Sequence, residues 1–311
     1  MKHLILTTAL AGALAGPAAA ETIGVSIPAA THGWAGALNF HAEQAVERLE
    51  QQYEDLDFVL TTTPDAGTQI SDLEDMVATR GIDALVVLPF ESEPLTGPVS
   101  RIAESGTWVT VVDRGLAQEG IEDLYVAGDN ESFGRTAGEY FVENLDEGAQ
   151  VVVLRGIPTS IDNERVEAFQ AALEGSGIEI LAMEHGNWNR DDSFTVMQDF
   201  LSRYGEIDAV WAADDDMALG AIAAIEQAGR TEEMWVVGGA GMKEMVRRVQ
   251  EGDPMVPVDV TYPPAMIATA IELTAAGLMQ DGLPMSGEFI IASELITPEN
   301  AEQYYFEDSP Y

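Results

Sequence analysis

Polar and aromatic side chains follow the apolar runs of this sequence, in positions that suit the binding of a polyhydroxylated molecule. Carboxylate and guanidinium groups form strong, charge-assisted hydrogen bonds with hydroxyls. A tryptophan ring adds an apolar plate for the C–H face of a sugar. We expect no catalytic residue and no metal ligand in this set. The candidate binding residues are Thr31, His32, Trp34, Asp113, Arg114, Asn163, Arg165, Trp188, Asp214, Ala240, Asp259 and Thr261.

Several of these residues also have a purely structural explanation. Trp34 and Trp188 are large enough to belong to a core. Asp214 precedes a segment of helical spacing and is well placed to cap its first turn. Asp113 and Arg114 are adjacent, as in a turn that carries a solvated ion pair. The whole set is therefore more informative than any one member.

Apolar, β-branched runs alternate with segments of helical spacing, and this alternation decides where the candidates lie. Strands are expected at 22–27, 58–61, 84–88, 108–112, 124–127, 151–154, 178–183, 209–212, 235–237 and 255–260. Helices are expected near 34–51, 68–79, 95–104, 131–145, 161–173, 191–203, 215–228, 242–250 and 263–279. Continuous apolar strands that alternate with helices indicate a parallel sheet with helices on both faces.

About ten strand–helix units are too many for one open sheet of ordinary size. The sequence therefore predicts an α/β protein of two doubly wound parallel-sheet domains. A single (β/α)₈ barrel is an alternative that the pattern leaves open. Ligands bind beyond the carboxyl ends of the strands in doubly wound sheets. Because the candidate residues follow strands, we expect them to meet in one cleft.

The N-terminal residues have the order of a secretory signal peptide. Met1, Lys2 and His3 form a short basic start, Leu4–Leu14 form an apolar run, and Pro17–Ala20 supply small residues at the expected cleavage position. We expect residues 1–20 to be removed and the mature chain to be periplasmic. The apolar run is shorter than the roughly 20 residues that span a bilayer, and the sequence contains no cysteine that could carry a lipid anchor.

The charge of the chain excludes several kinds of partner. The sequence has 54 Asp and Glu residues against 14 Lys and Arg, and its formal net charge is −40. Such a surface repels nucleic acid and anionic lipid, so neither is an expected partner. The acids are scattered through amphipathic segments instead of forming a tail, which is typical of proteins from salty environments.

Enzyme motifs are absent from the sequence. It has no nucleophile elbow, Walker loop or dinucleotide-binding fingerprint, and His32, His41 and His185 are not at metal-ligand spacing. The three carboxylates of Asp214–Asp216 open a helical segment and are better explained by capping than by a cation site. We expect no cofactor. A pair of glycosidase-type carboxylates hidden among the acids is the enzyme alternative.

Four segments carry a family resemblance: Val111–Arg114, Asn163–Phe169, Ala213–Ala221 and Trp235–Gly238. Nearly end to end, the mature chain resembles the periplasmic monosaccharide-binding proteins of the ribose-binding type, which are the soluble receptors of ABC importers. The resemblance implies the type I periplasmic binding fold, in which two lobes joined by three chain crossings close on a ligand.

The resemblance also implies roles for individual residues. Asp113 and Arg114 are expected to bind ring hydroxyls from the first lobe, and Arg165, Trp188 and Asp214 from the second. The resemblance thus implies that both lobes contact the ligand through residues that follow the ends of strands.

Four positions complete the resemblance or depart from it. Trp34 falls where the family has a stacking aromatic, and Thr261 where it has a polar hinge residue. Ala240 falls near the family's second acidic contact but has no side-chain acceptor, and Asp214 stands where Asn is usual. These departures argue against a standard ribose pyranose and leave a linear polyol, a pentose or another small sugar.

The implied lobes are residues 21–127 plus 261–286 and residues 128–260 plus 287–311. Crossings are expected near Ala127-Gly128, Val260-Thr261 and Ser286-Gly287. The expected ligand is a small neutral sugar or sugar alcohol, the expected partners are ABC importer permease subunits in the inner membrane, and the expected state is a monomer. A sugar-like signalling molecule or a chemoreceptor ligand is the alternative that the sequence does not distinguish.

Overall fold

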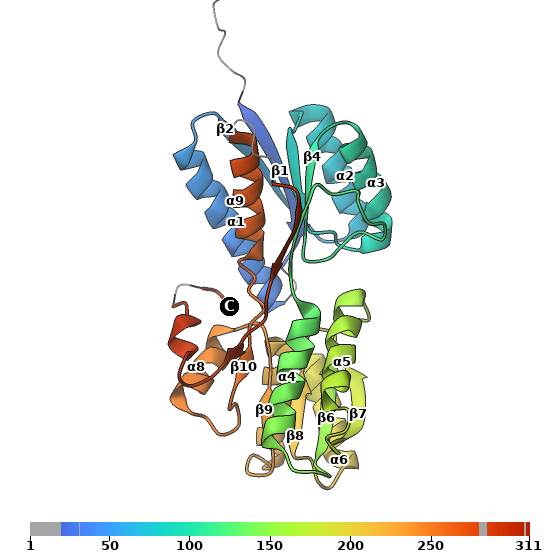
Figure 1. The fold of residues 1–311 in the computed structure, drawn as a ribbon, viewed down its shortest axis with the longest axis vertical. Helices are drawn as coiled ribbons and strands as arrows, with labels where there is room; N and C mark the ends of the chain where they lie inside the picture. Colours follow the sequence, from blue (N-terminus) through green and yellow to red (C-terminus); the bar gives the residue numbers. More distant parts are fainter. Residues whose placement is uncertain (1–19, 31, 280–284, 308) are drawn as a thin grey trace, which may run out of the picture.

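The structure is a computed structural model that describes residues 20–30, 32–279, 285–307 and 309–311. These residues form two lobes, stacked end to end, each built from a parallel sheet with helices on both faces (Figure 1). The prediction of two doubly wound parallel-sheet domains is confirmed. The expected signal peptide lies outside the described residues, apart from Ala20, and within the described ranges no helix is both long and apolar enough to cross a membrane.

The N-terminal lobe is organised around a six-stranded parallel sheet of order β11-β5-β4-β3-β1-β2. Its strands are β1 (Glu21–Pro28), β2 (Leu56–Thr63), β3 (Ala84–Val87), β4 (Trp108–Val112), β5 (Leu124–Gly128) and β11 (Gly287–Ile291). Its helices are α1 (Gly33–Gln52), α2 (Ala66–Asp75) with a π-helical turn at Met76–Arg80, α3 (Ser92–Glu104) and α9 (Met266–Met279). Helices α1 and α9 cover one face of the sheet, and α2 and α3 cover the other (Figure 1).

The C-terminal lobe has a four-stranded parallel sheet of order β7-β6-β8-β9. Its strands are β6 (Gln150–Arg155), β7 (Glu179–His185), β8 (Ala209–Ala212) and β9 (Trp235–Val237). Its helices are α4 (Asn130–Asn144), α5 (Ser160–Leu173), α6 (Arg190–Arg203), α7 (Asp215–Ala228) and α8 (Lys243–Glu251). Two short strands, β10 (Asp259–Val260) and β12 (Leu295–Ile296), pair antiparallel beside this sheet.

The central strands are apolar throughout because helices cover both of their faces. Ala84–Val87 and Val151–Leu154 are completely buried. In the C-terminal lobe, Phe169 of α5 stacks on Trp211 of β8 with ring centroids 4.1 Å apart. Apolar burial of this kind contributes about 25 cal/mol per Å², and it fixes the strand ends from which the candidate binding residues extend.

Three segments connect the lobes, and hydrogen bonds tie them to one another. The first follows β5 at Gly128, the second follows β10 at Val260, and the third follows β11 at Ile291. The N–H of Asp129 donates to the carbonyl of Ile291 at 2.9 Å. The N–H of Glu294 donates to Oγ1 of Thr261 at 2.8 Å. The side chain of Thr261 therefore bridges two of the three connections.

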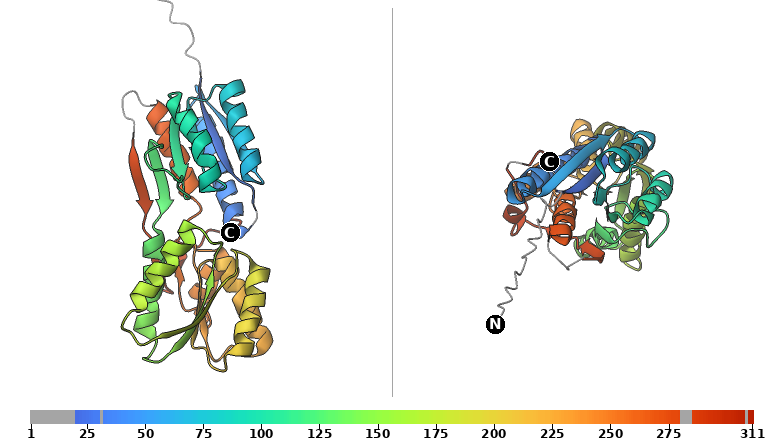
Figure 2. Two further views of the ribbon diagram at one scale, coloured as in Figure 1. Left: turned by 90° about the vertical axis from the view of Figure 1, so that its right-hand side faces the viewer. Right: turned by 90° about the horizontal axis from the view of Figure 1, so that it is seen from above.

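The expected third crossing at Ser286-Gly287 is wrong, and so is the placement of residues 287–291 in the second lobe. Gly287–Ile291 form β11, which pairs in parallel with β5 at the edge of the six-stranded sheet (Figure 2). The expected strand at 255–260 is also longer than the observed β10. Both differences arise because pairing partners far away in the chain, and not the local apolar pattern, decide where these segments are extended.

Candidate functional site

A cleft opens between the lobes at the carboxyl ends of the parallel strands. Its inner cavity has a volume of about 60 Å³ and continues into a wider mouth of about 590 Å³. The inner cavity is lined by His32, Trp34, Asp113, Arg114, Thr159, Ile161, Arg165, Trp188, Asp214, Ala240 and Tyr262. Eight of the twelve residues predicted from the sequence lie in this lining, and they come from both lobes.

Asp113 and Arg114 extend from the end of β4 in the N-terminal lobe. Asp113 has a φ of +59°, a left-handed conformation that is rare outside glycine and costs free energy. Its N–H donates to the carbonyl of Val126 at 2.9 Å. The guanidinium of Arg114 donates to the carbonyls of Pro89 and Phe90. The strained turn is therefore held in place by its neighbours and directs a carboxylate toward the cleft.

His32 and Trp34 lie at the start of α1, on the same side of the cleft. Their rings are nearly parallel, at 13°, with centroids 6.4 Å apart. Trp34 donates from Nε1 to the carbonyl of Tyr262 at 3.0 Å. Burial lowers the pKa of His32, so its ring is neutral at physiological pH, and its buried Nδ1 has no hydrogen-bond partner among the described residues.

Arg165 of α5 is the main cationic group that the C-terminal lobe contributes. Its Nε donates to Oδ1 of Asn130 at 2.9 Å, and its Nη1 donates to the carbonyl of Ala213 at 2.8 Å. The guanidinium carbon lies 4.2 Å from the ring centroids of both Phe133 and Tyr262. It also lies 5.4 Å from the ring centroid of Trp188, so two hydrogen bonds and three aromatic contacts leave this side chain little freedom and fix its position in the cleft.

Trp188 forms the apolar wall of the C-terminal lobe, after the end of β7. Its own φ is +56° and that of Asn187 is +59°, so two successive residues adopt the left-handed conformation. Its ring lies against Gly156, where a Cβ atom would be only 1.8 Å from Cζ2 of the indole. The loop after β6 therefore requires glycine at this position if the ring is to face the cleft.

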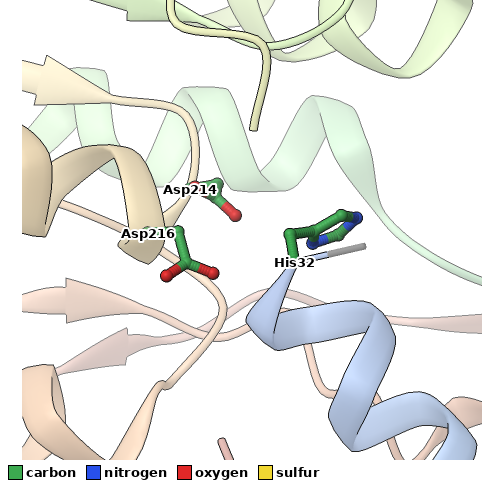
Figure 3. Close-up of side chains that lie close together, drawn as sticks. All are labelled: His32, Asp214 and Asp216. Atoms are coloured by element: carbon green, nitrogen blue, oxygen red, sulfur yellow. The ribbon is translucent and has the colours of Figure 1, made fainter. Parts of the chain in front are cut away.

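Asp214 and Asp216 lie at the N-terminus of α7 and approach His32 across the cleft (Figure 3). Oδ1 of Asp214 accepts from the N–H of Met217 at 2.8 Å, which is an N-cap. Burial raises the pKa of Asp214 to about 8. Oδ2 of Asp216 accepts from the N–H of Gly33 at 2.8 Å and thereby joins the two lobes.

The donor atoms of His32, Asp214 and Asp216 lie within 4.8 Å of one another, as they would around a metal ion. The two oxygens of Asp216 already accept hydrogen bonds, one from Gly33 and one from Nη2 of Arg190 at 2.9 Å. The guanidinium of Arg190 supplies the positive charge that the carboxylate needs. Hydrogen bonds and charge pairing account for this cluster, and we assign no metal to it.

Three of the predicted residues lie away from the inner cavity, and Thr31 falls outside the described residues. Asn163 is exposed and accepts from Arg155 at 2.8 Å. Thr261 is occupied in the hinge contact described above. Asp259 is fully buried next to Asp215, and burial raises its pKa to about 7. A strand-end residue that faces the cleft cannot be told from one that turns behind it by its place in the sequence.

Three lining residues were missed: Thr159, Ile161 and Tyr262. Tyr262 is the most connected of them, because its hydroxyl donates to Oδ1 of Asp113 at 2.6 Å. It directly follows Thr261, which was selected because it comes after a strand. Including one more residue after β10 would therefore have found Tyr262. Thr159 and Ile161 flank the start of α5 and had no comparable signal.

Comparisons with known proteins agree with this architecture. A family model described as a periplasmic binding protein domain matches residues 23–281. The D-ribose/D-allose-binding protein of Pseudomonas aeruginosa is 29% identical over 201 residues, which are 63% of this chain and 63% of that protein. The ribose import binding protein of Escherichia coli is 32% identical over 195 residues, which are 62% of this chain and 65% of that protein. The chain thus matches a little less than two thirds of the length of these relatives.

One solved structure extends the likeness to almost the whole chain. The crystal structure of a Caulobacter myo-inositol-binding protein, with myo-inositol bound, superposes with a TM-score of 0.80 at 26% identity. The superposition covers 93% of this chain and 98% of that one. Both lobes and the connections between them are therefore shared with that structure.

Proposed function

Because the chain belongs to the family of periplasmic binding protein domains, we propose that it is the solute-binding component of an ABC importer and holds a small neutral sugar or polyol between its lobes. The observation that carries the proposal is the convergence of hydroxyl-binding groups from both lobes on one cavity. Asp113 comes from the N-terminal lobe, and Arg165 and Asp214 come from the C-terminal lobe. A ligand that bonds to both sides stabilises the arrangement in which the lobes are close.

The lining suits a ligand with hydroxyls at its edge and C–H groups on its faces. Trp34 and Trp188 supply apolar rings from opposite lobes. Carboxylate and guanidinium groups supply acceptors and donors for hydroxyls. The relatives named above carry ribose, allose and myo-inositol in their names, and all three are polyhydroxylated and uncharged.

The charges around the cleft favour a neutral ligand. The inner cavity is lined by the carboxyl groups of Asp113 and Asp214 and by the guanidinium groups of Arg114 and Arg165. The pKa of Asp214 is raised to about 8, so near neutral pH its carboxyl group is protonated and can donate to a hydroxyl, and the carboxylate of Asp113 would repel the negative charge of a sugar acid. This balance supports sugars and sugar alcohols over sugar acids.

The proposed setting follows from the family. We propose that the mature protein is periplasmic and monomeric, and that its partner is the permease of the importer in the inner membrane. A sugar-like signalling molecule or a chemoreceptor ligand would use the same cleft and the same closure. The relatives named above are all binding proteins, which argues against the carbohydrate-active enzyme alternative.

A thermal-shift screen of the mature protein in high salt tests the proposal. Pentoses, hexoses, sugar alcohols and sugar acids are added separately. A ligand at about 100 times its dissociation constant should raise the free energy of unfolding by about 2.7 kcal/mol, which shifts the melting temperature visibly. We expect a shift with a neutral member and none with the sugar acids.

Variants of the cleft residues test whether the ligand that shifts the melting temperature binds in the cleft. Asp113→Ala and Trp188→Ala should abolish the ligand-induced shift. Trp235→Ala is the matched control, since Trp235 packs against Phe141 on the C-terminal lobe and does not line the cleft. It should melt earlier than the native protein but keep the shift. The sugar proposal fails if no carbohydrate moves the melting temperature of the native protein.

A further inference from the structure

Tyr262 occupies a position in the cleft that resembles the position of a ligand. It follows β10, is 2% exposed, and extends its ring into the inner cavity. Its hydroxyl donates to Oδ1 of Asp113, which belongs to the N-terminal lobe. The guanidinium of Arg165, from the C-terminal lobe, lies over its ring. The phenol ring of Tyr262 therefore lies between the carboxylate of Asp113 and the guanidinium group of Arg165, where a ring-shaped ligand with a hydroxyl would make the same contacts.

The surrounding backbone is built around this ring. A Cβ atom on Gly128 would lie 2.2 Å from Cε2 of Tyr262, so the first connection between the lobes needs glycine there. The ring of Phe133 meets that of Tyr262 edge to face at 89°, with centroids 6.0 Å apart. Trp34 holds the backbone of Tyr262 through its carbonyl oxygen. The ring is therefore packed on several sides and has no free space to withdraw into.

The neighbouring position offers nothing for a ligand to bond. The N–H of Ala240 donates to the carbonyl of Val260 at 2.7 Å, and Ala240 forms a parallel bridge with Thr261. Ala240 therefore lies beside the segment that carries Tyr262, and both line the inner cavity. A methyl group and an aromatic ring make this end of the cleft apolar, apart from a hydroxyl that is already bonded to Asp113.

The room that remains is small. The inner cavity of about 60 Å³ corresponds to roughly four to six water-sized groups, at about 10–15 Å³ for each. A linear polyol places about one CH–OH group in each such space. A six-carbon ring with its hydroxyls would fill or exceed the inner cavity, so the part of it that does not extend into the mouth would meet Ala240 or the ring of Tyr262.

We propose that Tyr262 is the specificity-determining residue of the cleft and restricts the ligand to polyols and sugars of three to five carbons. This inference rests on the proposed function and narrows its substrate class. Tyr262 occupies one oxygen of Asp113 and one face of the Arg165 guanidinium, so the ligand bonds to other polar groups of the lining, such as the second oxygen of Asp113, Asp214 and Thr159. Discrimination against longer ligands comes from the space that the phenol fills.

Calorimetric titration of the native protein is the first test. The probes are glycerol, erythritol, D-ribose and xylitol against D-glucose, D-allose and myo-inositol. We expect a member of the shorter set to bind at least tenfold more tightly than every six-carbon probe. If a six-carbon probe binds as tightly as the shorter ones, the inference about Tyr262 is wrong and the proposed function stands. If no probe of either length binds, the proposed function is wrong.

Substitution of Tyr262 is the second test. Tyr262→Ala should lower the preference for short over six-carbon ligands at least tenfold, mainly by improving the six-carbon affinity. Tyr262→Leu serves the same purpose if the alanine variant does not fold, since it keeps part of the buried volume. Tyr140→Ala is the matched control, because Tyr140 contacts Trp235 in the C-terminal lobe and not the cleft, and it should leave the preference unchanged. An unchanged preference in folded Tyr262 variants would overturn the inference.

Discussion

At the scale of single residues, Asp214 is placed for both of the roles that its position in the sequence allowed. It caps α7 through Oδ1, as a residue before a helix is expected to, and it also lines the cleft. The two roles are compatible because a carboxylate has two oxygens, and the cap uses one of them. Capping therefore leaves Asp214 an oxygen for the ligand that we propose.

The buried state of Asp214 makes stability depend on pH. Its pKa rises from 3.8 to about 8, first because of burial and then because Asp216 and Asp215 are close, while the N–H of Met217 and the guanidinium of Arg165 oppose the rise. Between these two values the folded chain keeps a proton that the unfolded chain releases. The free energy of unfolding should therefore fall as the pH rises from about 4 to about 8.

Asp214→Asn should make this fall shallower, by up to about 1.4 kcal/mol per pH unit. The amide keeps an oxygen for the cap on Met217 but does not titrate. Urea unfolding at a series of pH values from 5 to 8 measures the effect. Asp65→Asn is the matched control, because Asp65 is the exposed N-cap of α2 and its pKa is lowered by Thr68. Parallel pH profiles for native protein and Asp214→Asn would contradict the assignment.

Most of the cleft could be predicted at the residue scale, and the exceptions have a common cause. Strand ends are visible in the sequence, and Asp113, Arg165 and Trp188 were found from them. The direction in which a side chain leaves a strand end is set by backbone strain and by neighbours from other segments. Asp259 turns behind the cleft and Tyr262 turns into it, although both lie near the end of the same strand.

At the scale of elements, the contact between α4 and α5 positions Arg165. A Cβ atom on Gly134 of α4 would lie 1.9 Å from the backbone oxygen of Arg165. Gly134→Ala should therefore force the helices apart, lower the melting temperature and weaken ligand binding at least tenfold, because Arg165 moves with α5. Thermal unfolding and calorimetric titration measure the two effects.

Gly277→Ala is the control for this substitution. Gly277 lies in α9 and a Cβ atom there would meet nothing within 4 Å. Alanine should raise stability at this position by up to about 1 kcal/mol, since glycine is the poorer helix former. If Gly134→Ala were as harmless as Gly277→Ala, close packing of α4 on α5 would not be what places Arg165.

The sequence predicted the alternation of strands and helices well and failed where an element depends on a distant partner. The central strands are continuous apolar runs because both of their faces are buried. Such runs can be recognised as strands in the sequence. β11 has Phe289 and Ile290 at 47% and 45% exposure, and it is extended because it pairs with β5, far away in the chain. No pattern within residues 287–291 indicates that β5 is their partner. The third crossing between the lobes was therefore predicted at residue 286, before β11, instead of after it.

At the scale of the whole molecule, the structure shows one arrangement of two lobes that we propose can open. Asp216 bonds to Gly33 of the opposite lobe and to Arg190 of its own. Small-angle scattering should show a smaller radius of gyration at saturating ligand than without ligand. Asp216→Ala should enlarge the ligand-free form and increase this difference. Identical dimensions with and without ligand would count against closure.

The edge strand β11 also decides the order in which the lobes can be completed. The four-stranded sheet of the C-terminal lobe is contiguous and has all its strands once residue 237 has been synthesised. The six-stranded sheet begins at residue 21 but must wait for residue 291. Its last pairing closes a long loop, and such closures slow folding. The six-stranded sheet, whose first strand is synthesised first, is therefore completed after the four-stranded sheet.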